Sequence, residues 1–470
     1  MHIFQKSFVL IRDKFILFSG LNFAVAFFLS IITALINLNF FSAREILKFG
    51  YTENFTGIAN LKSNFPKMNS SLYLDTGSNF YEFSDFPVYP NSFREPLYPF
   101  FLKVTMSLFE YQQVIWIQRL LMLFSIFLLT LLFLEKFGKI HSFVLFLVIN
   151  LLTSVPFFYS QLLYPYSLSF ALSTSALFVF AKGRNNWKIY AFSGFLMGLV
   201  ALERQQALIF PITLTILVFL RETINVSSVR RILAFVSAFL IAISPGLANG
   251  LSGNYLGISS AQGYVMGYGF GADVSSSKND CINSAYLSSY AESVKKYGAD
   301  SGSLYFLGSQ VIKRESTIAI ENQRLSGAII QCLKNNPSIL FNHSVRNLLH
   351  LSERMITPRN PFTSKDLGEY WDANISMKPR FENPTTFVGL LLTGYVLLTL
   401  TRRFRKVDSI EVFIFAQLLS TGLVAVLTIY DPRYRINIDW LLYALIIKYA
   451  SDFFKAQNFY RRMTISSRRY

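Results

Sequence analysis

The sequence predicts an all-α polytopic membrane protein with about ten transmembrane helices, and three observations support that prediction. Hydrophobic residues make up 52% of the 470, and 48 of them are phenylalanine. Long stretches are almost free of charge, which a soluble core of this size would not require. Basic residues recur in alternate short connections, a pattern typical of the cytoplasmic side of such proteins.

Ten apolar segments approach the length of about 20 residues that a helix needs to cross the hydrocarbon core of a bilayer. In chain order they are residues 16–37, 114–134, 142–159, 166–181, 189–202, 207–220, 232–247, 386–400, 412–429 and 440–450. The first is too long for the apolar region of a signal peptide and lacks a small-residue cleavage pattern, so we expect it to remain as a helix.

Charge predicts which side each connection faces. The short connections and the C-terminal tail carry most of the lysine and arginine with few acids: Lys6, Arg12, Lys14, Lys136, Lys139, Lys182, Arg184, Lys188, Arg221, Arg230, Arg231, Arg402, Arg403, Arg405 and Lys406, then Lys455, Arg461, Arg462, Arg468 and Arg469. Both termini are therefore expected in the cytoplasm. The net charge of +17 fits attraction to anionic lipid, and no nucleic-acid partner is expected.

The two long connections, residues 41–113 and 248–385, mix acids and bases and are expected outside. The apolar stretch 96–109 predicts a helix at the membrane interface. A helical pattern over 326–353 contains Pro337, which predicts two helices separated there. Without an internal repeat, residues 1–470 are interpreted as one membrane domain with an outer cap.

Both cysteines, Cys281 and Cys332, fall in the second outer connection. An oxidising compartment favours a disulfide between them. Two free, buried thiols are the alternative that the sequence leaves open.

Residues 69–101 are rich in polar and charged side chains and lie between two apolar stretches. Asp75, Glu95 and Arg94 stand there among tyrosines that include Tyr73 and Tyr98. A carboxylate at a membrane surface can act as a general base, and an arginine can hold a phosphate through two hydrogen bonds. The alternative is that these carboxylates only pair with Arg94 or cap short helices.

This stretch resembles the first outer loop of the bacterial GT-C glycosyltransferases, the family-39-like membrane enzymes related to protein O-mannosyltransferases and aminoarabinose transferases. The matching residues are Tyr73, Gly77, Asn79 and the run Arg94-Glu95-Pro96-Leu97-Tyr98-Pro99. Further matches follow in the same order: Gly194, Gly198, Leu199, Leu202 and Arg204 with Pro211; Pro245, Gly253, Ser259, Gly263 and Gly269; Leu333 to Pro337; and Asp431 to Arg435.

The resemblance implies a glycosyltransferase in the bacterial inner membrane that takes a sugar from a polyprenyl-phosphate donor. The acceptor would be a glycan, a lipid or a protein, and neither a cofactor nor a metal is implied. The residues expected to bind substrate are Tyr73, Arg94, Tyr98, Arg204, Arg433, Tyr434 and Arg435. The four histidines are scattered and suggest no metal site.

The chain departs from the family at the catalytic aspartate, whose position holds Asn69. An amide takes no proton at neutral pH, so Asp75 becomes the expected base, with Glu95 as the alternative. The same departure supports a second hypothesis, a non-catalytic lipid-glycan binding or transport protein on this scaffold. A transporter more often has charged or broken helices at mid-membrane.

Three matched positions have simpler interpretations. Gly194 and Gly198 are typical of glycines that let two helices pack closely. Arg204, near the outer end of a predicted span, fits a structural arginine that reaches the interface as well as it fits a phosphate ligand.

Overall fold

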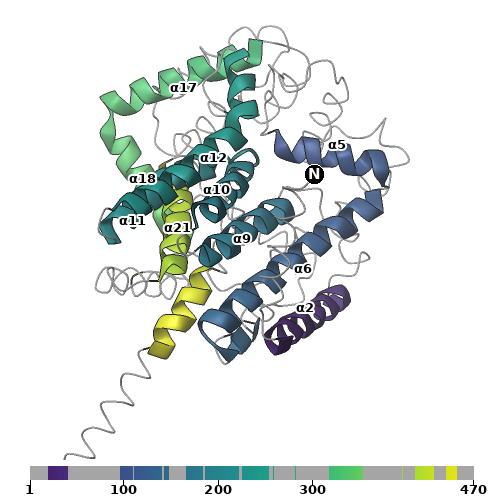
Figure 1. The fold of residues 1–470 in the computed structure, drawn as a ribbon. Coiled ribbons are helices and arrows are strands. Elements are labelled where there is room, and N and C mark those ends of the chain that lie inside the picture. The colour runs from purple at the N-terminus through teal and green to yellow at the C-terminus, as the bar shows by residue number, and fades with distance from the viewer. Residues whose placement is uncertain are drawn as a thin grey trace, which may run out of the picture.

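The computed structural model (Figure 1) describes residues 20–40, 96–109, 111–139, 142–144, 146–147, 166–183, 186–221, 225–252, 258, 281, 317–352, 394, 408–427 and 441–452. Regular structure in these ranges is helical, and no strand occurs in them. The all-α class predicted from composition is therefore confirmed for the described part of the chain.

Several of the helices coincide closely with predicted apolar segments. They are α2 (Gly20–Phe40), α5 (Leu97–Leu108), α6 (Tyr111–Lys136), α9 (Tyr166–Lys182), α10 (Trp187–Ala201), the 3-10 helix η3 (Gln205–Ile209), α11 (Phe210–Arg221), α12 (Val226–Ser252), α17 (Thr317–Asn335), α18 (Pro337–Ser352) and α21 (Ser409–Leu427). Residues 441–452 are also helical. Most of the predicted segments 142–159 and 386–400 lies outside the described residues.

The length and hydropathy of some helices are consistent with a membrane protein. Among the described residues, the stretches Gln113–Lys136 and Val226–Ala248 are long and apolar enough to cross a bilayer, and several shorter helices are also apolar. Large apolar side chains are exposed on α2, α11 and α12, among them Phe28, Leu220 and Leu240. Faces of this kind are stable against lipid and unfavourable in water. The ten-span arrangement itself stays a prediction.

The core is built around α10, which packs against α9 and α12 (Figure 1). A Cβ atom added at Gly198 would lie 2.7 Å from the Phe239 carbonyl oxygen, and one at Gly194 would lie 2.8 Å from the Phe235 carbonyl carbon. Both glycines thus let the backbones of α10 and α12 meet, which confirms the helix-packing interpretation.

Phenylalanine rings join α11 and α21 to this core. Phe413 of α21 lies 5.0 Å from Phe180 of α9 and 4.8 Å from Phe210 of α11, measured between ring centroids. All three side chains are almost fully buried. Tilted ring pairs at these separations add to the free energy gained from burial.

Basic residues from separate connections gather at one end of the bundle, here called the basic end. Lys182 at the end of α9 forms an ion pair with Glu135 near the end of α6. Lys448 Nζ lies 2.6 Å from Glu411 Oε2 in the first turn of α21. The basic end therefore brings together connections that the charge pattern assigns to one side of the membrane.

Three helices begin at the basic end, and each is capped by a polar side chain. Asn186 accepts a hydrogen bond from the Lys188 amide at the start of α10. Asn225 accepts one from the Ser228 amide, and the Ser228 hydroxyl accepts one from the Asn225 amide. These caps satisfy amides that a helix leaves unpaired at its start.

Asp408 caps α21 in the same way. Its carboxylate accepts hydrogen bonds from the Ser409 hydroxyl and the Ile410 amide, and its own amide donates to Glu411 Oε2 at 2.6 Å. Burial raises the pKa of Asp408, but these hydrogen bonds and the charge of Lys136 outweigh burial, so the pKa lies below its ordinary value. The charged form is thus favoured in the folded protein.

We expect Asp408→Ala to lower the free energy of unfolding by about 1 kcal/mol, because it removes the cap. Asp408→Asn keeps a capping oxygen and removes the charge, so it isolates the effect of ionisation. Since the pKa is depressed on folding, the advantage of wild type over Asp408→Asn should be complete above about pH 4 and fade as the pH falls further. Thermal unfolding of both proteins in detergent, at several values between about pH 3 and pH 6, measures this difference in stability. A difference that grows on acidification would contradict the assignment.

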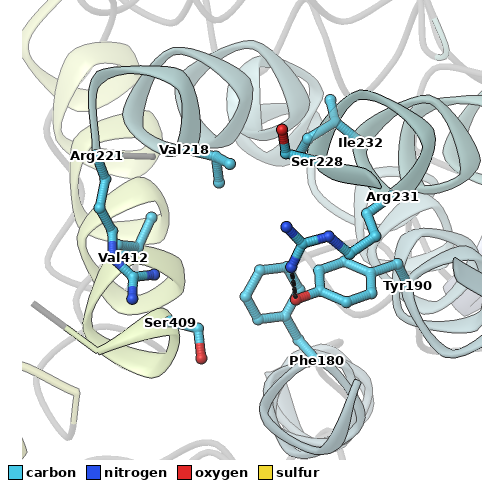
Figure 2. A pocket seen from close by; sticks show the side chains of 9 residues that line it. All are labelled: Phe180, Tyr190, Val218, Arg221, Ser228, Arg231, Ile232, Ser409 and Val412. Carbon is cyan, nitrogen blue, oxygen red and sulfur yellow. Dashed lines mark hydrogen bonds between the residues drawn. The ribbon is translucent and has the colours of Figure 1, made fainter. Parts of the chain in front are cut away.

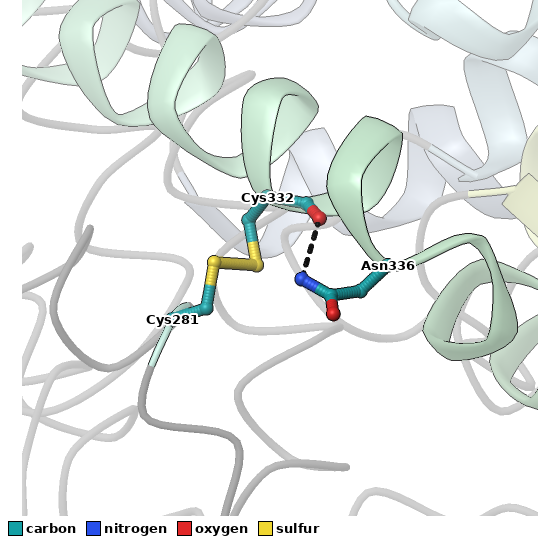
Figure 3. Close-up of a disulfide and its surroundings, with 3 residues drawn as sticks. All are labelled: Cys281, Cys332 and Asn336. Atoms are coloured by element: carbon teal, nitrogen blue, oxygen red, sulfur yellow. Dashed lines mark hydrogen bonds between the residues drawn. A yellow bond between two sulfur atoms is a disulfide. The ribbon is translucent and has the colours of Figure 1, made fainter.

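Helices α17 and α18 are separated at Asn336. The Asn336 amide still donates to the Cys332 carbonyl at 2.9 Å, and α18 begins at the proline, where a missing N–H is tolerated. The predicted break at Pro337 is confirmed. Figure 3 shows the disulfide between Cys281 and Cys332, whose Cα atoms are 6.0 Å apart, which confirms the favoured alternative.

Candidate functional site

The candidate site lies where the chain turns from α10 into α11. Helix α10 ends at Ala201, and Arg204 has an extended backbone with φ −140° and ψ 102°. The 3-10 helix η3 then leads into α11, whose second residue is Pro211. A proline in the first turn costs no helical hydrogen bond, so the sequence favours a fresh helix start here. Glu203 and Arg204 therefore lie between two helix ends.

Helix α5 docks onto this turn. The Leu97 amide donates a hydrogen bond to the Leu202 carbonyl at 3.1 Å. Tyr98, the next residue, is fully buried, and its hydroxyl donates to Gln118 Oε1 of α6 at 2.7 Å. A main-chain and a side-chain hydrogen bond thus fix the start of α5 against the turn after α10 and against α6.

Arg204 is held over an aromatic ring. Its guanidinium carbon lies 4.0 Å from the centroid of Tyr166, the first residue of α9, and the tyrosine is 3% exposed. A cation over a ring face at this distance gains electrostatic stabilisation, and more where water is excluded. The arrangement positions a permanent positive charge at the turn.

Glu203 is a member of the site that the sequence analysis missed. It is 2% exposed, and both carboxylate oxygens are shielded from solvent. In the sequence it opens the polar run Glu203-Arg204-Gln205-Gln206, which is typical of an exposed loop. Its burial comes from tertiary packing around the turn, which local sequence does not encode. Burial of a carboxylate is costly unless it is compensated, and buried titratable groups are common at functional sites.

Gly246 brings α12 close to the same turn. A Cβ atom at this position would lie 2.7 Å from Leu202 Cδ2 and would also collide with Ile258. Pro245 precedes it inside α12 and removes one helical hydrogen bond. The glycine that follows Pro245, a residue of the resemblance, thus packs against Leu202.

The other predicted site residues lie outside the described residues. These are Asn69, Tyr73, Asp75, Arg94 and Glu95 of the first outer connection, and Arg433, Tyr434 and Arg435 before the last helix. Of the predicted set, the structure places Tyr98 and Arg204, both next to the contact between Leu97 and Leu202. Among the described residues, no group of histidine, cysteine and carboxylate side chains is arranged to hold a metal ion.

No family model, curated protein or solved structure matches this chain. Leu97 and Leu202, which belong to two separate motifs of the sequence resemblance, are joined by a hydrogen bond.

Proposed function

We propose that the protein is a GT-C-type glycosyltransferase. It would transfer a sugar from a polyprenyl-phosphate donor to an acceptor at the outer face of a bacterial inner membrane. The observation that carries the proposal is the contact of α5 with the turn after α10, because it joins two separate segments of the resemblance at one place. Ten membrane spans with both termini in the cytoplasm are part of the proposal.

Arg204 has the role of stabilising the leaving phosphate. As the acceptor oxygen bonds to the anomeric carbon, the bond to the phosphate oxygen breaks, and that oxygen keeps the electron pair. A guanidinium held over Tyr166 offers a fixed positive charge to this oxygen. Arg433 and Arg435, with Tyr434 between them, complete the phosphate site in the proposal.

The acceptor must also lose a proton, and a carboxylate of the first outer connection takes it. Asp75 is the candidate, with Glu95 as the alternative, since the amide of Asn69 cannot serve. Tyr73 and Arg94 bind substrate beside it. The buried hydroxyl of Tyr98 already donates to Gln118, so this tyrosine positions α5.

A non-catalytic lipid-glycan binding or transport protein is the second candidate. The observation that favours it is Asn69, which stands where the family has its catalytic aspartate. Such a protein would bind the lipid-linked sugar and never cleave it. Turnover therefore separates the two candidates, whereas binding does not.

The test uses lipid extracts from a strain that lacks the gene. We expect a polyprenyl-phosphate-linked sugar to accumulate there, and purified wild-type protein to consume it. Arg204→Ala should turn it over on the order of a hundred-fold more slowly, because one charge-assisted contact to the leaving group is lost. Arg230→Ala is the matched control, since Arg230 lies over the Trp187 ring, 5.2 Å from its centroid, at the basic end.

Each outcome is informative. A folded Arg204→Ala protein with the wild-type rate would remove Arg204 from the phosphate site. Binding of the accumulated lipid without turnover by wild type would favour the second candidate. Absence of any accumulated lipid-linked sugar in the deletion strain would argue against both.

A further inference from the structure

Two features of the described chain have no part in the proposed function: a pocket at the basic end and the disulfide on α17. The pocket, lined by Tyr190, Arg221 and Arg231 among others, has room for about one water molecule, so it is no ligand site (Figure 2). The disulfide joins Cys281 to Cys332. It is the chemically reactive feature of the two, because thiolates exchange with S–S bonds.

The two bridged cysteines differ in their exposure to solvent. Cys281 is exposed, whereas Cys332 is 2% exposed. Cys332 belongs to the buried face of α17, together with Leu325, Ile329 and Leu333, which are 0%, 0% and 9% exposed. Figure 3 shows the bridge leading from this helix to Cys281, which lies outside it. A reagent in solution therefore reaches Cys281 far more easily than it reaches Cys332.

Access decides which sulfur of the bridge a thiolate attacks. In thiol–disulfide exchange the incoming sulfur bonds to one sulfur of the bridge, and the other sulfur leaves. Attack on Cys281 takes place at the protein surface and displaces Cys332. Attack on Cys332 requires the buried face of α17 to open first, which costs the free energy of a local unfolding step. The route through Cys281 is therefore the faster one.

We propose that Cys281 is the sulfur through which this disulfide exchanges with a dithiol reductant, and that Cys332 is the leaving thiol. One thiolate of the reductant attacks Sγ of Cys281, and the electron pair of the broken S–S bond stays on Sγ of Cys332. The second thiolate of the reductant then attacks its partner sulfur and releases Cys281. The dithiol thereby becomes a disulfide and supplies both electrons, and the two cysteine thiolates take up protons from water. The reverse sequence closes the bridge.

The end of α17 is held by contacts that do not involve sulfur. The Cys332 carbonyl accepts a hydrogen bond from the Asn336 amide at 2.9 Å and another from the Asn336 side-chain amide at 3.2 Å (Figure 3). Reduction of the bridge would therefore release the chain at Cys281 from α17 and leave the helix in place. The exchange site couples this one attachment to the redox state of its compartment, and it does not depend on glycosyl transfer.

The experiment treats folded, full-length wild type in neutral detergent with reduced glutathione, stops the reaction with acid and locates the adduct by peptide mass spectrometry. A monothiol has no second sulfur to complete the reduction, so it remains on the cysteine that it attacked. We expect the adduct on Cys281 to exceed that on Cys332 on the order of a hundred-fold, because the two sulfurs differ in access. In denaturant, which is the control, both cysteines should carry glutathione to a similar extent.

Two single variants give an independent readout with oxidised glutathione. Cys332→Ala keeps the exposed cysteine and should be modified on the order of a hundred-fold faster than Cys281→Ser, which keeps the buried one. Both variants should react at similar rates in denaturant. Should either variant fail to fold, the adduct pattern of wild type still decides. Similar adducts on both cysteines of the folded wild type, an excess on Cys332, or adducts only in denaturant would each overturn the proposal.

Discussion

Replacing Gly194 with alanine should lower the free energy of unfolding by about 3 kcal/mol or more, because the new methyl group has no space. The atom would meet the Phe235 carbonyl group of α12, whose carbon would be 2.8 Å away. Backbone cannot rotate aside as a side chain can, so α10 and α12 would have to separate. Gly198 lies one turn further along the same contact and faces Phe239 and Ala242. Unfolding of purified protein in mixed micelles measures the loss.

Gly422→Ala is the matched control for this prediction. Gly422 also lies inside an apolar helix, α21, but nothing is within 4 Å of an added Cβ atom. Alanine there should be neutral or stabilise by about 0.5–1 kcal/mol, because it favours the helix. Equal effects at both positions would show that the α10–α12 contact does not depend on glycine.

Removing the disulfide between Cys281 and Cys332 should cost about 4 kcal/mol, since the bridge closes a loop with a sequence separation of 51 residues. The chain-entropy argument places this effect mainly in the unfolded state. Cys281→Ser with Cys332→Ala suits the two environments, because Cys281 is exposed and Cys332 is 2% exposed. The unfolding midpoint is the measurement.

Reductant provides the control for the disulfide. It should lower the midpoint of wild type toward that of the double variant and leave the variant unchanged. Thiol labelling of unreduced, denatured wild type gives an independent check. Labelling of both cysteines under those conditions would contradict the bridge.

Helices could be predicted well where one local signal determines them. The length of its apolar stretch predicted a helix over residues 166–181, and α9 spans Tyr166–Lys182. Proline chemistry predicted the break at Pro337. The start of α12 was predicted at residue 232 and lies at Val226, because the reciprocal cap of Asn225 and Ser228 extends the helix through charged residues. Hydropathy alone does not register such a cap.

The candidate site could be predicted only in part. Arg204 and Tyr98 were identified from their neighbours in the sequence, yet nothing local indicates that Tyr166 lies beneath Arg204 or that Gln118 receives the Tyr98 hydroxyl. Glu203 was missed for the same reason, since its burial depends on how distant helices pack around the turn. Contacts of this kind depend on the tertiary structure, and composition and hydrophobic periodicity carry no information about it.

The hydrogen bond from Leu97 to Leu202 also sets an order of events during synthesis. About a hundred residues separate the two groups, so at ordinary translation rates α5 leaves the ribosome on the order of ten seconds before its acceptor. During that interval the Leu97 amide has no native partner at the α10 turn. The exposed apolar side chains of α5, Val104 and Leu108, suit a helix that waits at the membrane surface. A nascent chain that stops before residue 202 therefore lacks the site entirely, however well its first helices have inserted.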